Sequence, residues 1–372
     1  MWPRARLAAA GALGADIVAG LVGPHEPLWL QGTSRRLSGS VSNGVSSGRS
    51  SLGGLIMCEA ASTPSGARII DGKAIAAEIR AEIRHSVDEL KREHGTTPGL
   101  AVVLVGMRRD SQAYVRMKKQ ASDEVGFYSV DRSFPESVTQ DELLACVCEL
   151  NHDPKVHGIL VQLPLPAHID EAVVLEKIAV DKDVDGFSAV NIGNMCLRGG
   201  RRPPLALPCT PAGCIELLQR SGIQVSGKEA VVLGRSNIVG MPMSALLQSM
   251  DATVTVVHSR TKDIASHVRR AEIVVAAIGH AEMVQADWIK PGATVIDVGI
   301  NSKPSVKDKR GYKLVGDVDF EGVSKVAGAI TPVPGGVGPM TIAMLLKNTL
   351  NLARHSLGLT RLPLREERST RA

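Results

Sequence analysis

The run Gly99-Leu-Ala-Val-Val-Leu-Val105, followed by Asp110-Ser-Gln-Ala-Tyr-Val-Arg-Met-Lys118, decides the fold class. The first segment is continuously apolar, which indicates a strand buried on both faces, as in a parallel sheet covered by helices. Asp110 and Ser111 favour the start of a helix, because a side-chain oxygen there can accept a free N–H of the first turn. In that helix Tyr114 and Lys118 lie four residues apart on one face. They would stand at the carboxyl end of a strand, where open α/β sheets bind their ligands.

Tyr114 and Lys118 allow two interpretations. A phenol beside an amine can perform acid–base chemistry if burial lowers the pKa of the amine toward neutrality. The alternative is a surface helix with a solvated lysine, and this segment alone favours that alternative. The choice therefore depends on the rest of the chain.

Helices and strands alternate through the first half of the chain. A helix is predicted from Asp71-Gly72 to Gly95, since its large apolar residues recur at helical spacing. A strand near 127–134, a helix over 139–151 and a strand over 158–163 are predicted to follow. This alternation predicts a parallel sheet with helices on both faces.

Two polar features end this half. Gln162 is polar within an apolar strand, so it needs hydrogen-bond partners or solvent near a site. The turn Asp181-Lys-Asp-Val-Asp185-Gly-Phe187 is rich in carboxylates. It fits either a solvated loop or a binding carboxylate.

A dinucleotide-binding pattern marks the second half. A strand over 228–233 leads into Gly234-Arg-Ser-Asn-Ile-Val-Gly240, a tight turn that would deliver a helix N-terminus to phosphate. The turn departs from Gly-x-Gly-x-x-Gly, with Ser236 at the second glycine position and the last glycine one residue late. Strands predicted over 253–257, 272–276 and 294–298 surround it with a βαβ array, which predicts a Rossmann-like domain.

The end of the second strand in that domain bears on the choice of cofactor. An NAD site usually has an acidic residue there, which binds the ribose 2′-hydroxyl. This chain has His258-Ser259-Arg260 instead, with Arg235 in the first turn. Hydroxyl and guanidinium groups suit a 2′-phosphate, so NADP is favoured over NAD.

The segment Ile330-Thr-Pro-Val-Pro-Gly-Gly-Val-Gly-Pro-Met-Thr341 is predicted to be a shaped loop that runs into a helix over 340–355. Its glycines permit close approach of a ligand or of the other domain. The tail after Leu357 is basic and interrupted by proline, and we expect it to be disordered.

Residues 1–66 lack the pattern of a folded domain. They are basic and serine-rich, and no acidic residue lies between Glu26 and Glu59, which is typical of an organelle transit peptide. The sequence Arg35-Arg-Leu-Ser38 favours the mitochondrion, with the plastid as the alternative. The apolar patch over 7–22 is interrupted by Asp16 and is too short to span a bilayer, so a membrane is not an expected partner.

Composition excludes several classes of partner. The chain has 372 residues, 3% aromatic residues and a net charge of +5, most of which the two ends carry. The remainder has no basic stripe, so nucleic acid is not an expected partner. The six cysteines form no Cys-x-x-Cys pair and no zinc-finger cluster. Reduced thiols are therefore expected, rather than a disulfide framework or a metal site.

Six motifs carry a close resemblance to a known family over residues 67–355. They are Ser111-x-x-Tyr114-Val-x-x-Lys118, Val161-Gln-Leu-Pro-Leu-Pro166, Lys182-Asp-Val-Asp185-Gly186, Pro208-Cys-Thr-Pro211, Gly234-Arg-Ser-x-x-Val-Gly-x-Pro242 and Pro334-Gly-Gly-Val-Gly-Pro-Met-Thr341. In this order they resemble the bifunctional methylenetetrahydrofolate dehydrogenase/methenyltetrahydrofolate cyclohydrolase family. The resemblance implies oxidation of 5,10-methylenetetrahydrofolate with NADP+, followed by hydrolysis to 10-formyltetrahydrofolate.

The resemblance also implies an organisation of the chain. Two α/β domains would flank a cleft, with a catalytic folate-binding domain over 67–211 and a Rossmann-like NADP-binding domain over 212–339. A final helix over 340–357 would return to the first domain, before a disordered tail over 358–372. A homodimer that acts on tetrahydrofolate derivatives, with polyglutamylated forms expected, is implied as well.

Roles for individual residues follow from the motif matches. Lys118 would be the acid/base of the hydrolysis, and Gln162 would hold it in its working state. Tyr114 would stack on or orient the folate, and Asp185 would anchor the pterin. These four are the implied catalytic residues. The implied substrate-binding residues are Ser111, Tyr114, Gln162, Leu163, Asp185, Gly338, Pro339 and Thr341. The implied cofactor-binding residues are Thr210, Gly234, Arg235, Ser236, Val239, Gly240, His258, Ser259, Arg260, Gly279, Ile300 and Thr341.

Three other functions compete with this one. A monofunctional dehydrogenase would not need both Tyr114 and Lys118. An NADP-dependent hydroxy- or amino-acid dehydrogenase would explain the Rossmann-like half but not the loop over 334–341 or the first domain. A non-catalytic binding protein would be expected to lose the lysine or the phosphate turn, and this chain has both.

Overall fold

The computed structural model describes residues 66–197, 203–305 and 311–363, without the side chains of residues 109 and 110. Its elements are β1 (Arg68–Ile69), α1 (Gly72–His94), β2 (Gly99–Val105), α2 (Arg109–Glu124), β3 (Tyr128–Phe134), α3 (Gln140–His152), β4 (Gly158–Val161), α4 (Glu171–Glu176), α5 (Ala189–Cys196), α6 (Cys209–Arg220), β5 (Glu229–Leu233), α7 (Gly240–Ser249), β6 (Thr253–Val257), α8 (Ile264–Val268), β7 (Ile273–Ala276), β8 (Thr294–Asp297), β9 (Asn301–Pro304), β10 (Tyr312–Val315), α9 (Phe320–Val323), β11 (Ala329–Ile330) and α10 (Val337–Ser356). Short 3-10 turns lie at Val180–Lys182 and Ala286–Trp288. The alternation confirms the predicted α/β class.

The smaller sheet is parallel, with β2 between β3 and β4. Successive side chains of β2 enter two different apolar cores. Val103 packs among residues of α3 and α4, whereas Val102 packs among residues of α1 and α10. Burial on both faces explains why this strand is continuously apolar, and the prediction from residues 99–105 is confirmed.

The larger sheet has six parallel strands in the order β1-β11-β8-β7-β5-β6. β5 to β8 lie where the sequence predicted them, to within two residues. β1 pairs with β11, and the N–H of Arg68 donates to Gly328 O at 2.9 Å. Residues 68 and 69 therefore complete the edge of this sheet, contrary to their assignment to the folate-binding domain. β9 and β10 form a separate antiparallel pair.

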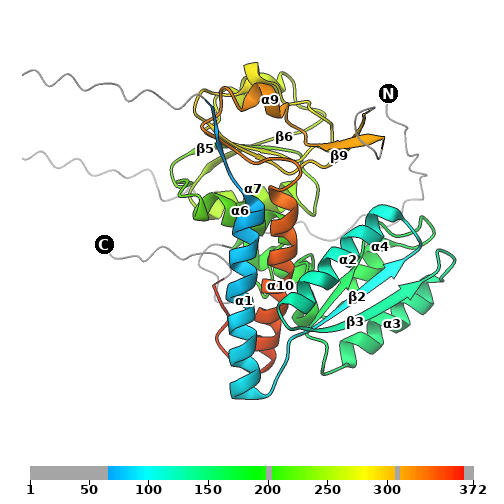
Figure 1. Cartoon of the computed structure of the whole chain (residues 1–372). Helices are drawn as coiled ribbons and strands as arrows, with labels where there is room; N and C mark the ends of the chain where they lie inside the picture. The colour runs from blue at the N-terminus through cyan, green and yellow to red at the C-terminus, as the bar shows by residue number, and fades with distance from the viewer. Residues whose placement is uncertain (1–65, 198–202, 306–310, 364–372) are drawn as a thin grey trace, which may run out of the picture. The chain divides into compact units, whose positions relative to one another are not determined.

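Three helices, α1, α6 and α10, pack against one another (Figure 1). α1 begins where the Asp71 side chain accepts the N–H of Lys73 and Ala74, and it ends at Gly95, whose φ is 64°. Both ends agree with the prediction. α10 begins at Val337 rather than near residue 340, and it contacts α1, α2 and β4. The C-terminal helix thus returns to the first half of the chain, as expected.

Helix α2 begins earlier than predicted. It starts at Arg109, and Arg108 precedes it without a side-chain hydrogen bond to the first turn. The carbonyl of Arg108 accepts the N–H of Gln112 at 3.0 Å, so the first turn closes ahead of the expected start. Ser111 therefore lies within that turn, 4% exposed, instead of beginning the helix.

Part of the C-terminal tail packs on α10, contrary to the disorder expected over 358–372. The N–H of Leu362 donates to Asn351 Oδ1 at 2.8 Å, and Asn351 Nδ2 donates back to Leu362 O at 3.1 Å. Leu359 and Leu362 also pack against the core around α10, and this apolar contact offsets the cost of fixing the backbone. Residues 364–372 lie outside the described residues, as does the predicted transit peptide up to residue 65.

The predicted boundary between residues 211 and 212 falls inside α6. Within the described ranges, no helix combines the length and apolarity needed to cross a bilayer. The same ranges contain no group of three or more His, Cys, Asp or Glu side chains that could hold a metal ion. The described cysteines are free thiols, and Cys58 lies outside the described residues.

Candidate active site

A cavity of about 400 Å³ opens where strands of both sheets end. Residues of the first half that line it are Tyr114, Lys118, Leu160, Val161, Gln162, Leu163, Asp185 and Phe187. Residues of the second half that line it are Thr210, Ile238, Val239, Val298, Ile300, Val337, Gly338, Thr341 and Ile342. The structure therefore brings most of the predicted substrate residues together with part of the predicted cofactor set, as expected of a cleft at the carboxyl ends of strands.

The amine of Lys118 is held by an amide. Its Nζ donates to Gln162 Oε1 at 3.0 Å, and Gln162 Nε2 donates to Leu163 O at 2.8 Å, which keeps the amide oxygen toward the lysine. Burial lowers the pKa of Lys118, against the attraction of Asp185 and Cys209, which raises it. A desolvated amine of lowered pKa can be neutral and accept a proton. The cavity thus favours the acid–base interpretation over a solvated lysine.

Asp185 lines the same cavity from a turn that a second carboxylate organises. Asp183 is 5% exposed, and it accepts the N–H of Phe187 at 3.3 Å and Nδ2 of Asn191 at 3.0 Å. Burial raises the pKa of Asp185 to about 6, while the charge of Lys118 lowers it. The turn over 181–187 therefore presents a carboxylate to the cavity, which favours the binding interpretation over a solvated loop.

Two residues that sequence reasoning missed support Asp185. Cys209 Sγ donates to Val184 O at 3.4 Å and to Asp185 Oδ1 at 3.8 Å. Burial raises the pKa of this thiol well above its ordinary value, so it remains a donor. From α10, Asn348 Nδ2 donates to Val184 O and Leu207 O, both at 2.8 Å. In the sequence, Cys209 lies within the motif Pro208-Cys-Thr-Pro211, and Asn348 is a polar residue on the buried face of a helix. These two features were the signals from which the residues could have been predicted.

The threonines of α6 and α10 meet at the cavity. Thr210 Oγ1 and Thr341 Oγ1 lie 3.0 Å apart and share a hydrogen bond. Gly338 lines the cavity one turn before Thr341. Two predicted substrate residues are not brought to this cavity: Ser111 is buried within α2, and Pro339 is not part of the lining.

The predicted phosphate turn follows β5 and lies against the ends of its two neighbouring strands. The N–H of Gly234 donates to Val257 O at 2.8 Å, and a Cβ at Gly234 would lie 2.1 Å from Ala277 O. With φ at 115° as well, only glycine fits there. Ser236 Oγ accepts the N–H of Gly240 at 3.3 Å, where α7 begins. The turn delivers a helix N-terminus as predicted.

The loop after β6 lies beside this turn. β5 and β6 pair in parallel up to Leu233 and Val257, so the residues that follow the two strands are neighbours. Ser259, Arg260 and Arg235 are exposed there, and their polar groups can reach an anion from solvent. The N–H of His258 donates to Thr261 Oγ1 at 3.0 Å and shapes the loop. Gly279, with φ at 73°, lies in the next loop, after β7.

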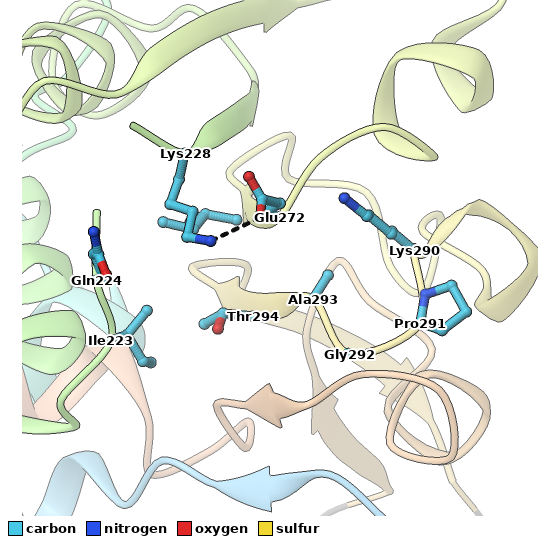
Figure 2. A pocket seen from close by; sticks show the side chains of 10 residues that line it. Ile223, Gln224, Lys228, Glu272, Lys290, Pro291, Gly292, Ala293 and Thr294 are labelled. Carbon is cyan, nitrogen blue, oxygen red and sulfur yellow. Dashed lines mark hydrogen bonds and ion pairs between the residues drawn. The ribbon is translucent and has the colours of Figure 1, made fainter. Parts of the chain in front are cut away.

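A second cavity, of about 200 Å³, lies at the opposite ends of the strands in the larger sheet (Figure 2). Its lining includes Lys228, whose Nζ donates to Glu272 Oε1 at 2.8 Å. None of the predicted site residues lines it. Because α/β sheets bind ligands at the carboxyl ends of their strands, the first cavity is the better candidate.

Models of one enzyme family match both halves of the chain. Residues 70–185 match the catalytic domain of tetrahydrofolate dehydrogenase/cyclohydrolase, and residues 208–357 match its NAD(P)-binding domain. The chain belongs to this family. The family, the fold class and the bifunctional dehydrogenase/cyclohydrolase class predicted from the sequence are confirmed, and the second match extends through α10.

Several family members are similar along most of their length. The bifunctional protein FolD 2 of Arabidopsis thaliana is 58% identical over 299 residues, which cover 80% of this chain and 99% of the relative. The chloroplastic FolD 4 of that plant is 56% identical, with coverage of 78% and 80%. Its mitochondrial FolD 1 is 53% identical, with coverage of 77% and 81%.

Solved structures extend the likeness to the fold. The structure of the methylenetetrahydrofolate dehydrogenase-cyclohydrolase of Trypanosoma brucei was solved with NADP cofactor and inhibitor. Its sequence is 47% identical to that of the present chain. The match covers 78% of this chain and 99% of that one, with a TM-score of 0.76. Family membership therefore rests on both sequence and structure.

Proposed function

We propose that the protein oxidises 5,10-methylenetetrahydrofolate to the 5,10-methenyl form with NADP+ and then hydrolyses the product to 10-formyltetrahydrofolate. One observation supports this most directly: Lys118, bonded to Gln162, shares a single cavity with residues of the NAD(P)-binding half. A folate bound in that cavity can undergo both reactions without leaving it. The hydroxy- or amino-acid dehydrogenase alternative gives no role to this lysine.

The oxidation needs alignment more than proton transfer. The nitrogen lone pairs beside the methylene carbon stabilise the cation that forms there, and bound NADP+ accepts the hydride. Thr210, Gly338 and Thr341 line the cavity on the α6 and α10 side, where they would hold the folate against the cofactor domain. Fixing two reactants in this way lowers the entropic part of the barrier. No histidine is required.

The hydrolysis needs a base. Water that attacks the methenyl carbon must lose a proton, and the neutral amine of Lys118 can accept it. Gln162 Oε1 accepts a hydrogen bond from the resulting ammonium, and the carboxylate of Asp185 stabilises its charge. The proton then passes to the folate nitrogen that is released when its bond to the carbon breaks. As that bond breaks, the hydroxyl group on the carbon loses its own proton to solvent and becomes the formyl C=O, so hydrolysis of the cation releases one proton overall. The formyl group stays on the other nitrogen.

The residues around the phosphate turn fit NADP. A side chain at Gly234 would fill the space where the turn approaches the next loop, and the N-terminus of α7 follows. Such a turn suits the cofactor diphosphate. Arg235, Ser259 and Arg260 are exposed nearby and suit the 2′-phosphate. We assign these contacts to the cofactor.

An absorbance assay on the full chain tests the function. With 5,10-methylenetetrahydrofolate as substrate, we expect reduced cofactor to form with NADP and more slowly with NAD, with little methenyl intermediate accumulating. Reduced cofactor and the methenyl form are followed separately. Accumulation of the methenyl form would establish a monofunctional dehydrogenase, and no turnover with either cofactor would support the binding-protein alternative.

Replacing Asp185 with asparagine is expected to shift the acid limb of the cyclohydrolase pH profile. The negative charge of Asp185 raises the pKa of Lys118, so its removal lowers that pKa further and keeps the amine neutral at lower pH. The limb should therefore move to lower pH in turnover measured at saturating substrate, while folate affinity falls. Asp181→Asn, at an exposed position of the same turn, should leave the profile unchanged. A limb that stayed in place or moved to higher pH would exclude this coupling.

We further propose that the enzyme is a homodimer of the mitochondrion and prefers polyglutamylated folates. A groove of about 1060 Å³ between α4, α5 and α7 contains Ile192, Met195 and Met241, the last 51% exposed, and such an apolar surface suits a second copy. Light scattering tests the dimer.

The composition of residues 1–66 supports import, and imaging of a C-terminally tagged chain separates mitochondrion from plastid. Comparing KM for mono- and polyglutamylated substrate tests the preference.

A further inference from the structure

Two buried carboxylates lie beneath the loops that follow β7 and β8. Asp297 is the last residue of β8 and is 3% exposed. Asp317 follows β10 and is 0% exposed. Neither takes part in the reaction steps above, and burying a carboxylate is costly unless hydrogen bonds compensate. What these two residues bind therefore indicates their role.

Asp317 gathers four N–H donors. Its Oδ2 accepts the backbone N–H of Ile278 at 2.7 Å and of Gly279 at 2.9 Å, and its Oδ1 accepts the backbone N–H of His280 at 2.9 Å. Oδ1 also accepts Nδ2 of Asn301, at 2.9 Å. Three of the donors are consecutive backbone groups of the loop after β7. One carboxylate thus fixes the backbone of residues 278–280 within that loop.

Asp297 holds Asp317 in turn. Its Oδ1 accepts the N–H of Gly299 at 3.0 Å and of Asp317 at 2.9 Å, and its Oδ2 accepts the N–H of Val318 at 3.0 Å. The N–H of Asp297 itself donates to Thr331 Oγ1 at 2.8 Å, in the loop that leads to α10. The two aspartates therefore connect the loops after β7 and β8 with the one before α10.

Two glycines make room for this pair. A Cβ at Gly299 would lie 2.3 Å from the Asp317 carboxyl carbon, and a Cβ at Gly316 would lie 1.8 Å from Asp297 Oδ2. Each aspartate is thus packed against a glycine from the other's segment. Because Gly299 and Gly316 have no side chain, they leave the space that the two carboxylates occupy.

The loop that Asp317 fixes lies on the cofactor side of the cleft. It follows β7, whose neighbour β5 leads into the phosphate turn, and Gly234 packs against Ala277 at its start. We propose that Asp317, held by Asp297, is a positioning residue for NADP, because it fixes the Ile278–His280 backbone in the shape that receives the cofactor. The inference rests on the proposed function. The aspartate touches neither reactant.

The full-length variants Asp317→Asn and Asp297→Asn test the proposal as a pair. Each carboxylate oxygen of Asp317 accepts two N–H groups, so an asparagine at 317 points its NH2 group at two donors in either orientation. At position 297 one oxygen accepts only the N–H of Val318, so an asparagine there can point its NH2 group at that single donor. Leaving two buried donors unpaired predicts a rise of about tenfold or more in KM and Kd for NADP with Asp317→Asn, and of about threefold with Asp297→Asn. Cyclohydrolase kcat/KM, assayed on the methenyl substrate without NADP, should stay within about twofold of wild type.

Asn301→Ala removes a single donor to Asp317 and decides the matter if Asp317→Asn does not fold. It should raise KM for NADP by about threefold and leave the cyclohydrolase reaction unchanged. An unchanged KM for NADP in the folded variants overturns the proposal, and so does an equal loss of both activities. A wild-type chain that hydrolyses the methenyl substrate but does not turn over NADP would instead overturn the proposed function.

Discussion

Lys118→Met is expected to reduce cyclohydrolase turnover by about 10²-fold or more and to leave measurable dehydrogenase activity. Methionine fills a similar volume but cannot accept the proton that attacking water must lose. The effect is large because the burial that lowers the pKa of Lys118 also keeps bulk solvent from replacing it as the base. Hydride transfer depends on alignment of folate and nicotinamide, so it survives the loss of the amine.

The two activities are measured on the same protein preparation. Loss of the methenyl absorbance without cofactor reports the cyclohydrolase, and formation of NADPH from the methylene substrate reports the dehydrogenase. In the variant the methenyl form should accumulate during oxidation, as it does not in the wild type. An equal loss of both activities would refute this division of labour between Lys118 and the cofactor domain.

Lys119→Met provides the matched control. Lys119 is the next residue of α2, its side chain is 51% exposed, and it pairs with Asp131 on β3 instead of facing the cavity. This substitution replaces the neighbouring lysine of the same helix with the same residue, so it controls for the general effect of a Lys→Met change in α2. Both activities should remain near those of the wild type, because an exposed ion pair contributes less than about 1 kcal/mol.

The arrangement of the candidate site was predicted where short sequence patterns specify it. The continuous apolar run of β2 fixes a strand with both faces buried, and the helix after it places Tyr114 and Lys118 where that strand ends. Gln162 lies 44 residues from Lys118 in the sequence, yet their contact was expected from the motifs, and the two side chains are hydrogen-bonded at 3.0 Å. Their catalytic roles remain proposals.

Long-range contacts could not be predicted in the same way. Asn348 supports Asp185 through the carbonyl of Val184, 164 residues away, and helical spacing marks a buried polar residue without naming its partner. β1 has two residues, too few to show a strand period, so its place in the larger sheet was missed. The pairing of Leu362 with Asn351 likewise depends on a contact made only once α10 has formed.

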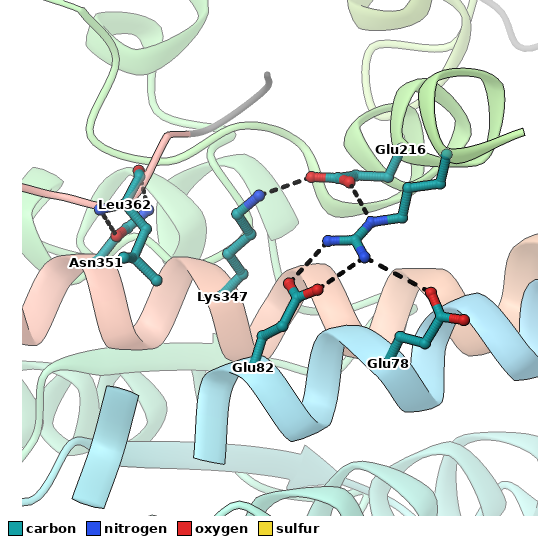
Figure 3. Close-up of polar contacts among 7 residues, drawn as sticks. Glu78, Glu82, Glu216, Lys347, Asn351 and Leu362 are labelled. Atoms are coloured by element: carbon teal, nitrogen blue, oxygen red, sulfur yellow. Dashed lines mark hydrogen bonds and ion pairs between the residues drawn. The ribbon is translucent and has the colours of Figure 1, made fainter. Parts of the chain in front are cut away.

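Arg220→Met is expected to lower the free energy of unfolding by about 3 kcal/mol, because Arg220 joins two helices and neutralises a buried carboxylate. Its Nη1 and Nη2 donate to the two carboxylate oxygens of Glu82 on α1, both at 2.8 Å (Figure 3). Its Nε donates to Glu216, one turn earlier on α6, at 3.0 Å. The Glu216 side chain is 3% exposed and also accepts Lys347 Nζ, from α10, at 2.6 Å. Without Arg220 this carboxylate has one cation instead of two.

Urea unfolding of the full chain measures the effect, and the same network supplies a control. Glu78 is 63% exposed and lies 3.7 Å from Arg220 Nη1, so Glu78→Gln should change the free energy of unfolding by less than about 0.5 kcal/mol. If Glu78→Gln and Arg220→Met had equal effects, the burial of Glu216 would not be what makes the network matter.

The pH dependence of stability gives a second readout. The hydrogen bond from Arg220 lowers the pKa of Glu82 below its ordinary value of 4.5. A carboxylate with a lowered folded-state pKa stabilises the fold above its unfolded-state pKa, and this contribution is lost as pH falls through the folded-state value. The difference in stability between wild type and Arg220→Met should therefore narrow as the pH falls below 4.5.

Removing both cations isolates the cost of the buried charge. In Arg220→Met/Lys347→Met, Glu216 keeps neither of the two cations that bind it in the wild type, so the combined loss should exceed the sum of the single losses. Adding Glu216→Gln to that double variant removes the charge and should recover part of the stability, even though it is a third substitution in one network. A further loss on adding Glu216→Gln would mean that hydrogen-bond geometry, and not an unpaired buried charge, sets the stability of the α1–α6–α10 junction.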